Sequence, residues 1–207
     1  MFQSRAGLVA RINVTAIQPN TPAQFLIRAS LASISETWRS AAMNAYRAAW
    51  ITLAIANPYL DIFGVQRRLT GGAFFAKLNR NLATLGLPVI LTAPTTLSTG
   101  APGLLSLSHA AGPPEQFLVT PTVQPAGTEA VVIRATKPLS PAMQTLHNTQ
   151  TVIQTFSAGT NGPWDIVTAY KAKNKNVASG QQVFVLVNYV NATTGFAGQQ
   201  SIDAVLW

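Results

Sequence analysis

Few side chains in this sequence have the types and spacing that catalysis requires. The chain has two histidines, His109 among Ser and Ala residues and His147 among Thr and Asn residues. Neither has an acidic neighbour in the sequence that we expect to lie beside it. A histidine that acts as a general base or a metal ligand needs partner groups at fixed positions. We therefore expect both histidines to be structural.

The other candidate motifs also lack essential members. The six acidic residues are spread along the whole chain and form neither a paired-carboxylate motif nor a calcium loop. Gly71-Gly72 lacks the Lys-Ser/Thr of a phosphate-binding loop, so a helix cap explains it better. The chain has no cysteine, which excludes disulfides, thiolate metal sites and cysteine nucleophiles. The sequence therefore predicts a protein that is not an enzyme and that uses no metal or cofactor.

The basic residues suggest binding rather than catalysis. Residues 1–90 contain nine Arg or Lys against Glu36 and Asp61, a net charge of +7, whereas residues 91–207 contain five basic and four acidic residues, a net charge of +1. Eight of the nine basic residues are arginines, whose planar fork suits ordered contacts with carboxylates, phosphates and carbonyls. The candidate partner-interface residues are Arg5, Arg11, Arg28, Arg39, Arg67 and Arg68. The alternative is a solvated basic face that binds nothing.

The overall composition suits a subunit of an assembly. Only 10% of the residues are charged, against roughly 25% in an average soluble protein. The 48% of apolar residues are enough to form a core. No stretch approaches 18 uninterrupted apolar residues, so we expect no membrane span.

The residues that must position these groups begin with a predicted helix. Thr21 is a suitable N-cap, Pro22 fits the first helical position, and Gln24 completes a capping box. Three stripes of apolar residues at helical spacing follow: Ile27, Leu31, Ile34 and Trp38; Met43, Tyr46, Trp50 and Leu53; and Phe74, Leu78, Leu82 and Leu85. Gly86, Leu87 and Pro88 end the third stripe. The sequence therefore predicts a helical region of three helices over residues 21–88.

The residues before this region read as an extended basic arm, residues 1–20. Leu8, Ala10, Ile12 and Val14 alternate weakly, yet no hairpin partner lies nearby. Such arms become ordered by joining another subunit's sheet or groove. The alternative is an ordinary first strand of the C-terminal domain.

The residues after Pro88 have a different character. Residues 89–103 are rich in Thr, Pro, Ser and Gly, which predicts a linker. Short β-branched runs separated by turn signals then predict seven strands: Leu104–Ser108, Gln116–Thr122, Ala130–Ala135, Thr149–Phe156, Trp164–Tyr170, Gln182–Asn191 and Ser201–Leu206. Such spacing is typical of an all-β sandwich. Between two of these strands, Lys171-Ala-Lys-Asn-Lys175 is predicted to be a solvated turn, with a phosphate contact as the alternative.

The predicted fold class is thus α+β: an extended N-terminal arm, a small helical region and a C-terminal antiparallel β-sandwich over residues 104–207. Two stretches also carry a resemblance to known proteins. Residues 5–90 contain, in order, Pro-Asn-Thr-Pro-Ala-Gln, Tyr-Arg-Ala-Ala-Trp, Leu-Thr-Gly-Gly-x-Phe-Phe and Leu-Gly-Leu-Pro. This order resembles a group of uncharacterised virion-associated proteins of tailed bacteriophages. The last hundred residues, with Val-Phe-Val-Leu-Val-Asn-Tyr-Val-Asn before Thr-Thr-Gly-Phe, are similar to fibronectin type III or immunoglobulin-like sandwiches.

The resemblance implies a non-enzymatic structural protein of a virion, assembled in the cytoplasm of the host bacterium. Its expected role is that of a head cement or decoration protein whose arm and helical region grip the capsid shell. The expected partners are the major capsid protein or other virion subunits, including neighbouring copies of this chain. One alternative is a component of the neck or tail. An alternative of another class is a basic nucleic-acid-binding protein, since the N-terminal half has the charge to neutralise phosphates.

Overall fold

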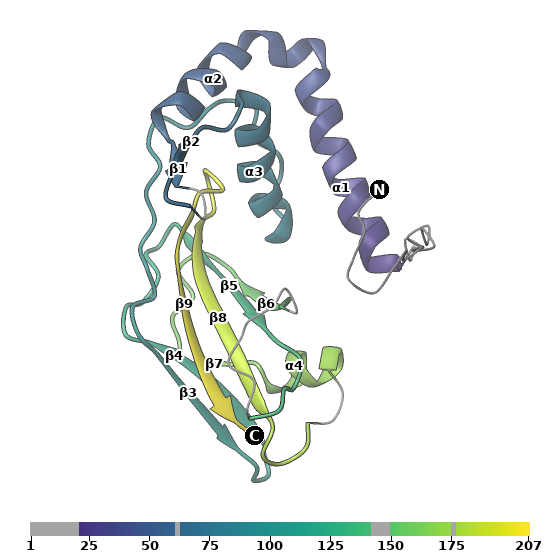
Figure 1. Ribbon diagram of the computed structural model, residues 1–207, viewed down its shortest axis with the longest axis vertical. Helices are drawn as coiled ribbons and strands as arrows, with labels where there is room; N and C mark the ends of the chain where they lie inside the picture. Colours follow the sequence, from purple (N-terminus) through teal and green to yellow (C-terminus); the bar gives the residue numbers. More distant parts are fainter. Residues whose placement is uncertain (1–20, 61–62, 142–149, 175–176) are drawn as a thin grey trace, which may run out of the picture.

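The computed structural model describes residues 21–60, 63–141, 150–174 and 177–207. Within them, four α-helices and antiparallel sheets form an α+β structure, with the helical region at one end of the paired sheets (Figure 1). This confirms the predicted fold class at that level. The predicted arm, with Arg5 and Arg11, lies outside the described residues, as does His147.

Helix α1 (Pro22–Arg39) begins with the predicted capping box. The Thr21 hydroxyl accepts a hydrogen bond from the Gln24 N–H at 3.3 Å, and the Gln24 side chain accepts one from the Thr21 N–H at 3.4 Å. A 3₁₀ helix, η1 (Ala41–Ala45), and helix α2 (Arg47–Ala56) follow after a corner at Ser40. Arg47 stabilises this corner by donating to the carbonyl oxygen of Trp38 at 2.9 Å, with its guanidinium 5.8 Å from the centre of the Trp38 ring.

Helix α3 (Gly71–Thr84) packs closely on α2 and begins at the N-cap Thr70. A Cβ atom on Gly71 would lie only 2.7 Å from Ile51 Cγ1, so glycine permits the close approach of the two helices. The cap itself is Thr70, and Gly71 and Gly72 are the first two residues of the helix. The helix ends as predicted, because Gly86 has φ +72° and the N–H of Leu87 reaches back to the carbonyl oxygen of Leu82 at 2.9 Å.

The core of the helical region is formed by seven buried residues of α1, η1, α2 and α3: Ile34, Met43, Trp50, Ala54, Phe74, Phe75 and Leu78. Residues 89–103, predicted to be a linker, contain no helix or strand. Their first part packs on this core through Val89, Ile90, Leu91, Ala93 and Leu97. The buried Asn79 accepts from the Ile90 N–H at 2.8 Å and donates to the Ile90 carbonyl at 3.3 Å, while the Trp50 indole donates to the Leu91 carbonyl at 2.7 Å.

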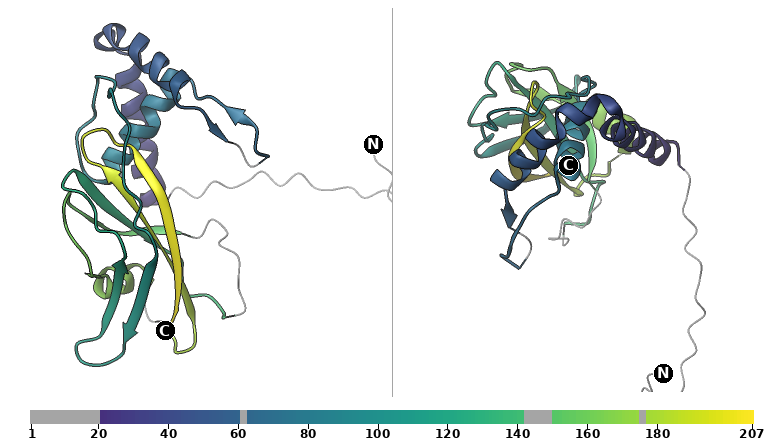
Figure 2. Two further views of the ribbon diagram at one scale, coloured as in Figure 1. Left: turned by 90° about the vertical axis from the view of Figure 1, so that its left-hand side faces the viewer. Right: turned by 90° about the horizontal axis from the view of Figure 1, so that it is seen from above.

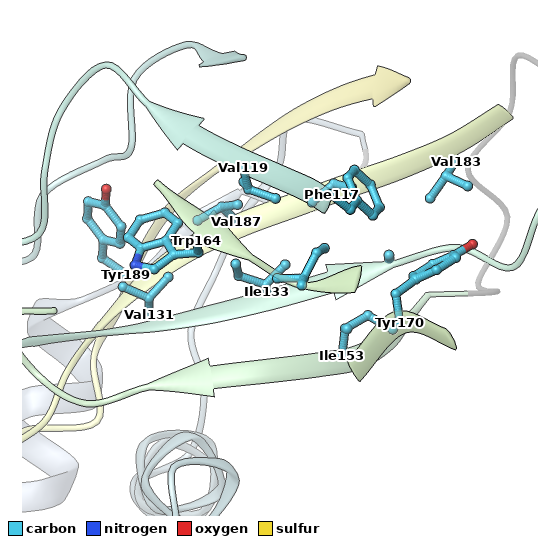
Figure 3. Packing of buried hydrophobic residues seen from close by; sticks show 13 residues of the cluster. Phe117, Val119, Val131, Ile133, Ile153, Trp164, Tyr170, Val183, Val187 and Tyr189 are labelled. Carbon is cyan, nitrogen blue, oxygen red and sulfur yellow. The ribbon is translucent and has the colours of Figure 1, made fainter. Parts of the chain in front are cut away.

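Two antiparallel sheets form the sandwich. One has the order β3 (Leu105–Ala110), β4 (Gln116–Pro121), β7 (Trp164–Asp165), and the other has the order β6 (Thr151–Phe156), β5 (Glu129–Ala135), β8 (Gln182–Asn191), β9 (Ala197–Leu206). Their facing side chains fill one core, to which β8 contributes Val183, Val185, Val187 and Tyr189 in the predicted alternation (Figure 3). A separate two-stranded hairpin, β1 (Tyr59–Leu60) and β2 (Gln66–Arg67), projects from the helical region.

The predicted strand Trp164–Tyr170 is wrong. Strand β7 stops at Asp165, and helix α4 (Val167–Asn174) follows it. Asp165 Oδ1 accepts hydrogen bonds from the N–H groups of Val167 at 3.0 Å and Phe117 at 3.1 Å, which offers the backbone a local alternative to the ladder. The predicted solvated turn at Lys171-Ala-Lys-Asn-Lys175 is wrong for the same reason, since Lys171 and Lys173 lie on α4.

The turn between β8 and β9 joins the two halves of the molecule. Gly195, with φ +70°, lies so close to α3 that an added Cβ would collide with the carbonyl oxygen of Leu78. Asn81 of α3 donates to the Gly195 carbonyl at 2.9 Å, and the next residue, Phe196, packs against the helical core. The helical region is therefore fixed to the sandwich by backbone contact as well as by side chains.

Replacing Asn79 tests how residues 89–97 are bound to the helical core. We expect Asn79→Ala to lower the free energy of unfolding by roughly 1–3 kcal/mol, because the partly buried N–H and C=O groups of Ile90 lose their partners. Urea unfolding followed by circular dichroism measures the change. The control Thr84→Ala, which removes a surface hydrogen bond from the same helix, is expected to cost less than about 0.5 kcal/mol. Equal costs for the two variants would contradict this role of Asn79.

Candidate assembly surface

The first turns of α1 expose large apolar side chains in an unusual arrangement. Phe25 is 70% exposed, Leu26 is 69% exposed and Ile27 is 49% exposed. Successive residues of a helix point about 100° apart, so these three side chains span roughly 200° of the helix circumference. We call Phe25, Leu26 and Ile27 the α1 tip. A helix that is apolar over so much of its circumference is normally enclosed by other structure.

Among the described residues, the buried contacts of α1 come from its second half. Ile34 is fully buried, and the Trp38 ring lies 5.3 Å from the Phe75 ring of α3. The predicted stripe from Ile27 to Trp38 is therefore covered towards its C-terminal end and exposed at Ile27. In Figure 1 the helix runs down past α3, and its N-terminal half stands apart from both α3 and the sandwich.

A second apolar surface lies on α2 and the hairpin. Its members are exposed by 44–82% of their area, and they are Ile51, Ile55, Tyr59, Phe63 and Val65. We call these five residues the α2–hairpin surface. Figure 1 shows the hairpin and α1 on opposite sides of α3, and Figure 2 shows the hairpin projecting away from the end of α2.

The structure distributes the predicted arginines over both surfaces and does not gather them at one site. Arg28 is exposed and directly follows the α1 tip, whereas Arg67 and Arg68 are exposed at the end of the hairpin. Arg39 lies in the last turn of α1, where its Nε donates to the carbonyl oxygen of Ser35 at 3.2 Å. Arginine is therefore found beside apolar side chains at both surfaces, a combination typical of protein interfaces.

Sequence reasoning selected the arginines and missed the apolar surfaces. The available signal was that Phe25 and Leu26 stand directly before Ile27, outside the single stripe that one buried face requires. It also missed a basic pair at the junction of α3 and β5. There Arg134 donates to Asn188 at 2.7 Å, and burial, followed by the positive charge of Arg80, lowers the pKa of Arg134.

Three ionisable side chains of the sandwich, His109, Glu115 and Lys171, lie together. His109 Nε2 lies 3.1 Å from Glu115 Oε1, and Lys171 pairs with the other carboxylate oxygen. The prediction that His109 has no acidic neighbour is therefore wrong, because the antiparallel pairing of β3 with β4 brings Glu115 back beside it. The His109 ring also stacks on Trp207, with ring centres 3.9 Å apart, so its surroundings are packed.

The remaining features offer little for chemistry. Lys173 donates to the backbone carbonyls of Val152 and Ile153 in β6. An open groove of about 590 Å³ between residues 90–96 and the Thr193–Thr194 turn has no ionisable side chain in its lining. Among the described residues, no three His, Cys, Asp or Glu side chains lie together as metal ligands would.

The chain matches no known protein-family profile, no curated protein and no solved structure. In the part of the chain that the structure describes, no helix has the length and apolar character to span a membrane.

The Glu115 cluster predicts a pH dependence of stability. The hydrogen bond from Lys171, and after it the hydrogen bond from His109, holds the pKa of Glu115 below its ordinary value of 4.5. A carboxylate with a lowered pKa in the folded state stabilises the protein above pH 4.5, and this stability is lost as the pH falls through the lowered pKa. We expect Glu115→Gln to unfold at a lower temperature than the wild type near neutral pH.

Thermal unfolding at a series of pH values measures this difference, which should disappear in acid. Glu36→Gln, at an exposed position of α1, is the control for the removal of a carboxylate outside this cluster. A difference between Glu115→Gln and the wild type that stays constant down to strongly acidic pH would show that the ion pairs of Glu115 contribute nothing.

Proposed function

We propose that this chain is a non-enzymatic structural subunit of a bacteriophage virion, and that it acts as a head cement or decoration protein. The observation that carries the proposal is the pair of exposed apolar surfaces on a helical region that is firmly joined to a sandwich. Such surfaces on a soluble chain mark sites of protein association. In this proposal the arm and the helical region bind the shell, and the sandwich faces outward or towards neighbouring subunits.

The strand order supports an immunoglobulin-like or fibronectin type III-like identity for residues 104–207. In chain order, the strands β3 to β9 correspond to A, B, C, C′, E, F and G. The four-stranded sheet then reads C′-C-F-G and the other sheet reads A-B-E. Immunoglobulin-like sandwiches that contain a C′ strand place it beside C in the sheet of F and G. Helix α4 occupies the connection between the strands that correspond to E and F.

The charge distribution supports a protein partner with acidic groups, for which the major capsid protein is the proposed candidate. Arg28 is exposed beside the α1 tip and Arg68 is exposed beside the hairpin, so that an acidic partner could be contacted at either place. Arg47 is engaged by backbone carbonyls of its own chain and is not part of this surface.

The alternative role in the neck or tail is favoured by one feature, the position of the two apolar surfaces on opposite sides of α3. That arrangement suits a ring of a few copies. Nucleic-acid binding is the weaker alternative, because the described arginines are dispersed and stand beside exposed apolar side chains.

Quantitative mass spectrometry of purified virions tests the proposal. We expect this chain to be present at a copy number comparable with that of the major capsid protein, because cement proteins cover the shell. A handful of copies per particle would favour the neck or tail. Absence from virions that have been purified away from host proteins would overturn both roles.

A truncation tests the proposed grip of the arm. Deleting residues 1–18 leaves the Thr21 cap in place and is expected to abolish or greatly weaken binding to particles that lack the protein. Replacing Arg5 and Arg11 with Ala should have a smaller effect that grows with salt, because an exposed ion pair contributes about 1 kcal/mol at most. Gel densitometry measures occupancy. If the truncated chain binds as well as the full chain, the arm is not the grip.

A further inference from the structure

Two different apolar surfaces on one chain raise the question of what covers each of them. A contact in which a surface meets its own copy would cover that surface and leave the other exposed. A contact between the α1 tip of one copy and the α2–hairpin surface of the next covers both with a single repeated interface. Since the surfaces lie on opposite sides of α3 (Figure 1), such a contact runs head to tail.

The shapes of the two surfaces fit this arrangement. The α1 tip is a projecting helix with apolar side chains in three directions, and it needs a partner that touches more than one side. The α2–hairpin surface is built from α2 and from the hairpin, which projects away from the end of α2 and so offers contacts on more than one side (Figure 2). Two α1 tips laid against each other would each remain exposed on the side away from the other.

The areas are also consistent with one interface. Taking roughly 200 Å² for an exposed aromatic side chain and about half of that for an aliphatic one, the eight side chains of the two surfaces expose on the order of 600 Å². A small standard interface buries roughly 1,200 Å² in total, of which a little over half is apolar. The apolar area of one α1 tip and one α2–hairpin surface therefore suffices for about one such interface.

We propose that copies of this chain associate head to tail, with the α1 tip of each copy bound to the α2–hairpin surface of the next. The repeated contact forms a closed ring if the rotation between copies closes, and an open filament if it does not. Apolar burial drives the contact, and basic residues flank both surfaces at Arg28 and Arg68. Salt is therefore expected to preserve or strengthen the association, whereas it would weaken binding to an acidic protein or to nucleic acid.

Sedimentation velocity of the purified full chain, over a wide range of protein concentration and of salt, tests the association. We expect species larger than a dimer that persist at high salt. A chain that stays monomeric throughout would overturn the inference, and so would association that salt abolishes. The inference rests on the proposed structural role, but it is measured on the isolated chain, so absence from virions and failure to self-associate are separate results.

Two variants separate the halves of the contact. Leu26→Glu alters the α1 tip and Ile55→Glu alters the α2–hairpin surface, and each is expected to weaken association by about tenfold or more, because the interface would bury an unpaired charge. Leu104→Glu, at a residue of the sandwich that is 78% exposed, is the matched control and should associate like the wild type. Circular dichroism checks folding, and the uncharged variants Leu26→Gln and Ile55→Gln repeat the test with less perturbation.

A mixing experiment then tests the head-to-tail geometry. Leu26→Glu retains an intact α2–hairpin surface, and Ile55→Glu retains an intact α1 tip. Each variant alone should be monomeric, while an equimolar mixture should form a dimer of one copy of each that grows no further. A mixture that remains monomeric would overturn the head-to-tail contact, as would unimpaired assembly of either variant alone.

Discussion

The close approach of Gly195 to helix α3 determines how the surfaces of the molecule are presented. The backbone of the β8–β9 turn touches the backbone of α3 near Leu78, and the Asn81 side chain binds the same turn. Because α3 is fixed there, the elements that pack on it, α2 and the second half of α1, are fixed as well. The α1 tip and the hairpin then extend beyond this support on opposite sides of α3, with their apolar side chains exposed (Figure 1).

The low content of charged residues affects how readily these surfaces associate. With 10% charged residues, few charges interrupt the exposed apolar groups, and the net charge of +7 in residues 1–90 opposes association less as salt rises. Two of the buried polar side chains bind backbone groups of their own chain. The Asn79 side chain binds the backbone of Ile90, and the carboxylate of Glu129 accepts hydrogen bonds from the N–H groups of Gly100 and Ala126. These buried polar side chains thus stabilise the fold, and the groups available for association lie on the surface of the helical region.

The features that were predictable from the sequence are those with local causes. Thr21 and Gln24 are three residues apart, and Gly86 directly follows the last turn of α3, so their patterns are visible along the chain. The alternation from Val183 to Tyr189 has the same local character. By contrast, Asn81 and Gly195 are 114 residues apart, and Glu115 reaches His109 only through strand pairing. Helix α4 was not predicted, because the Asp165 side chain binds backbone N–H groups that would otherwise continue the strand. The helical spacing identified Ile27 as apolar, but spacing alone does not show whether other residues cover it.

Hydrogen–deuterium exchange of the amides of α1 tests most directly the claim that association covers the α1 tip. We expect the amides of residues 25–30 to exchange quickly in the dilute chain and to become protected when the chain associates. The amides of α3 should be protected in both states, because α3 is held by α2 and by the β8–β9 turn. Equal exchange of residues 25–30 in the dilute and the associated chain would contradict the account.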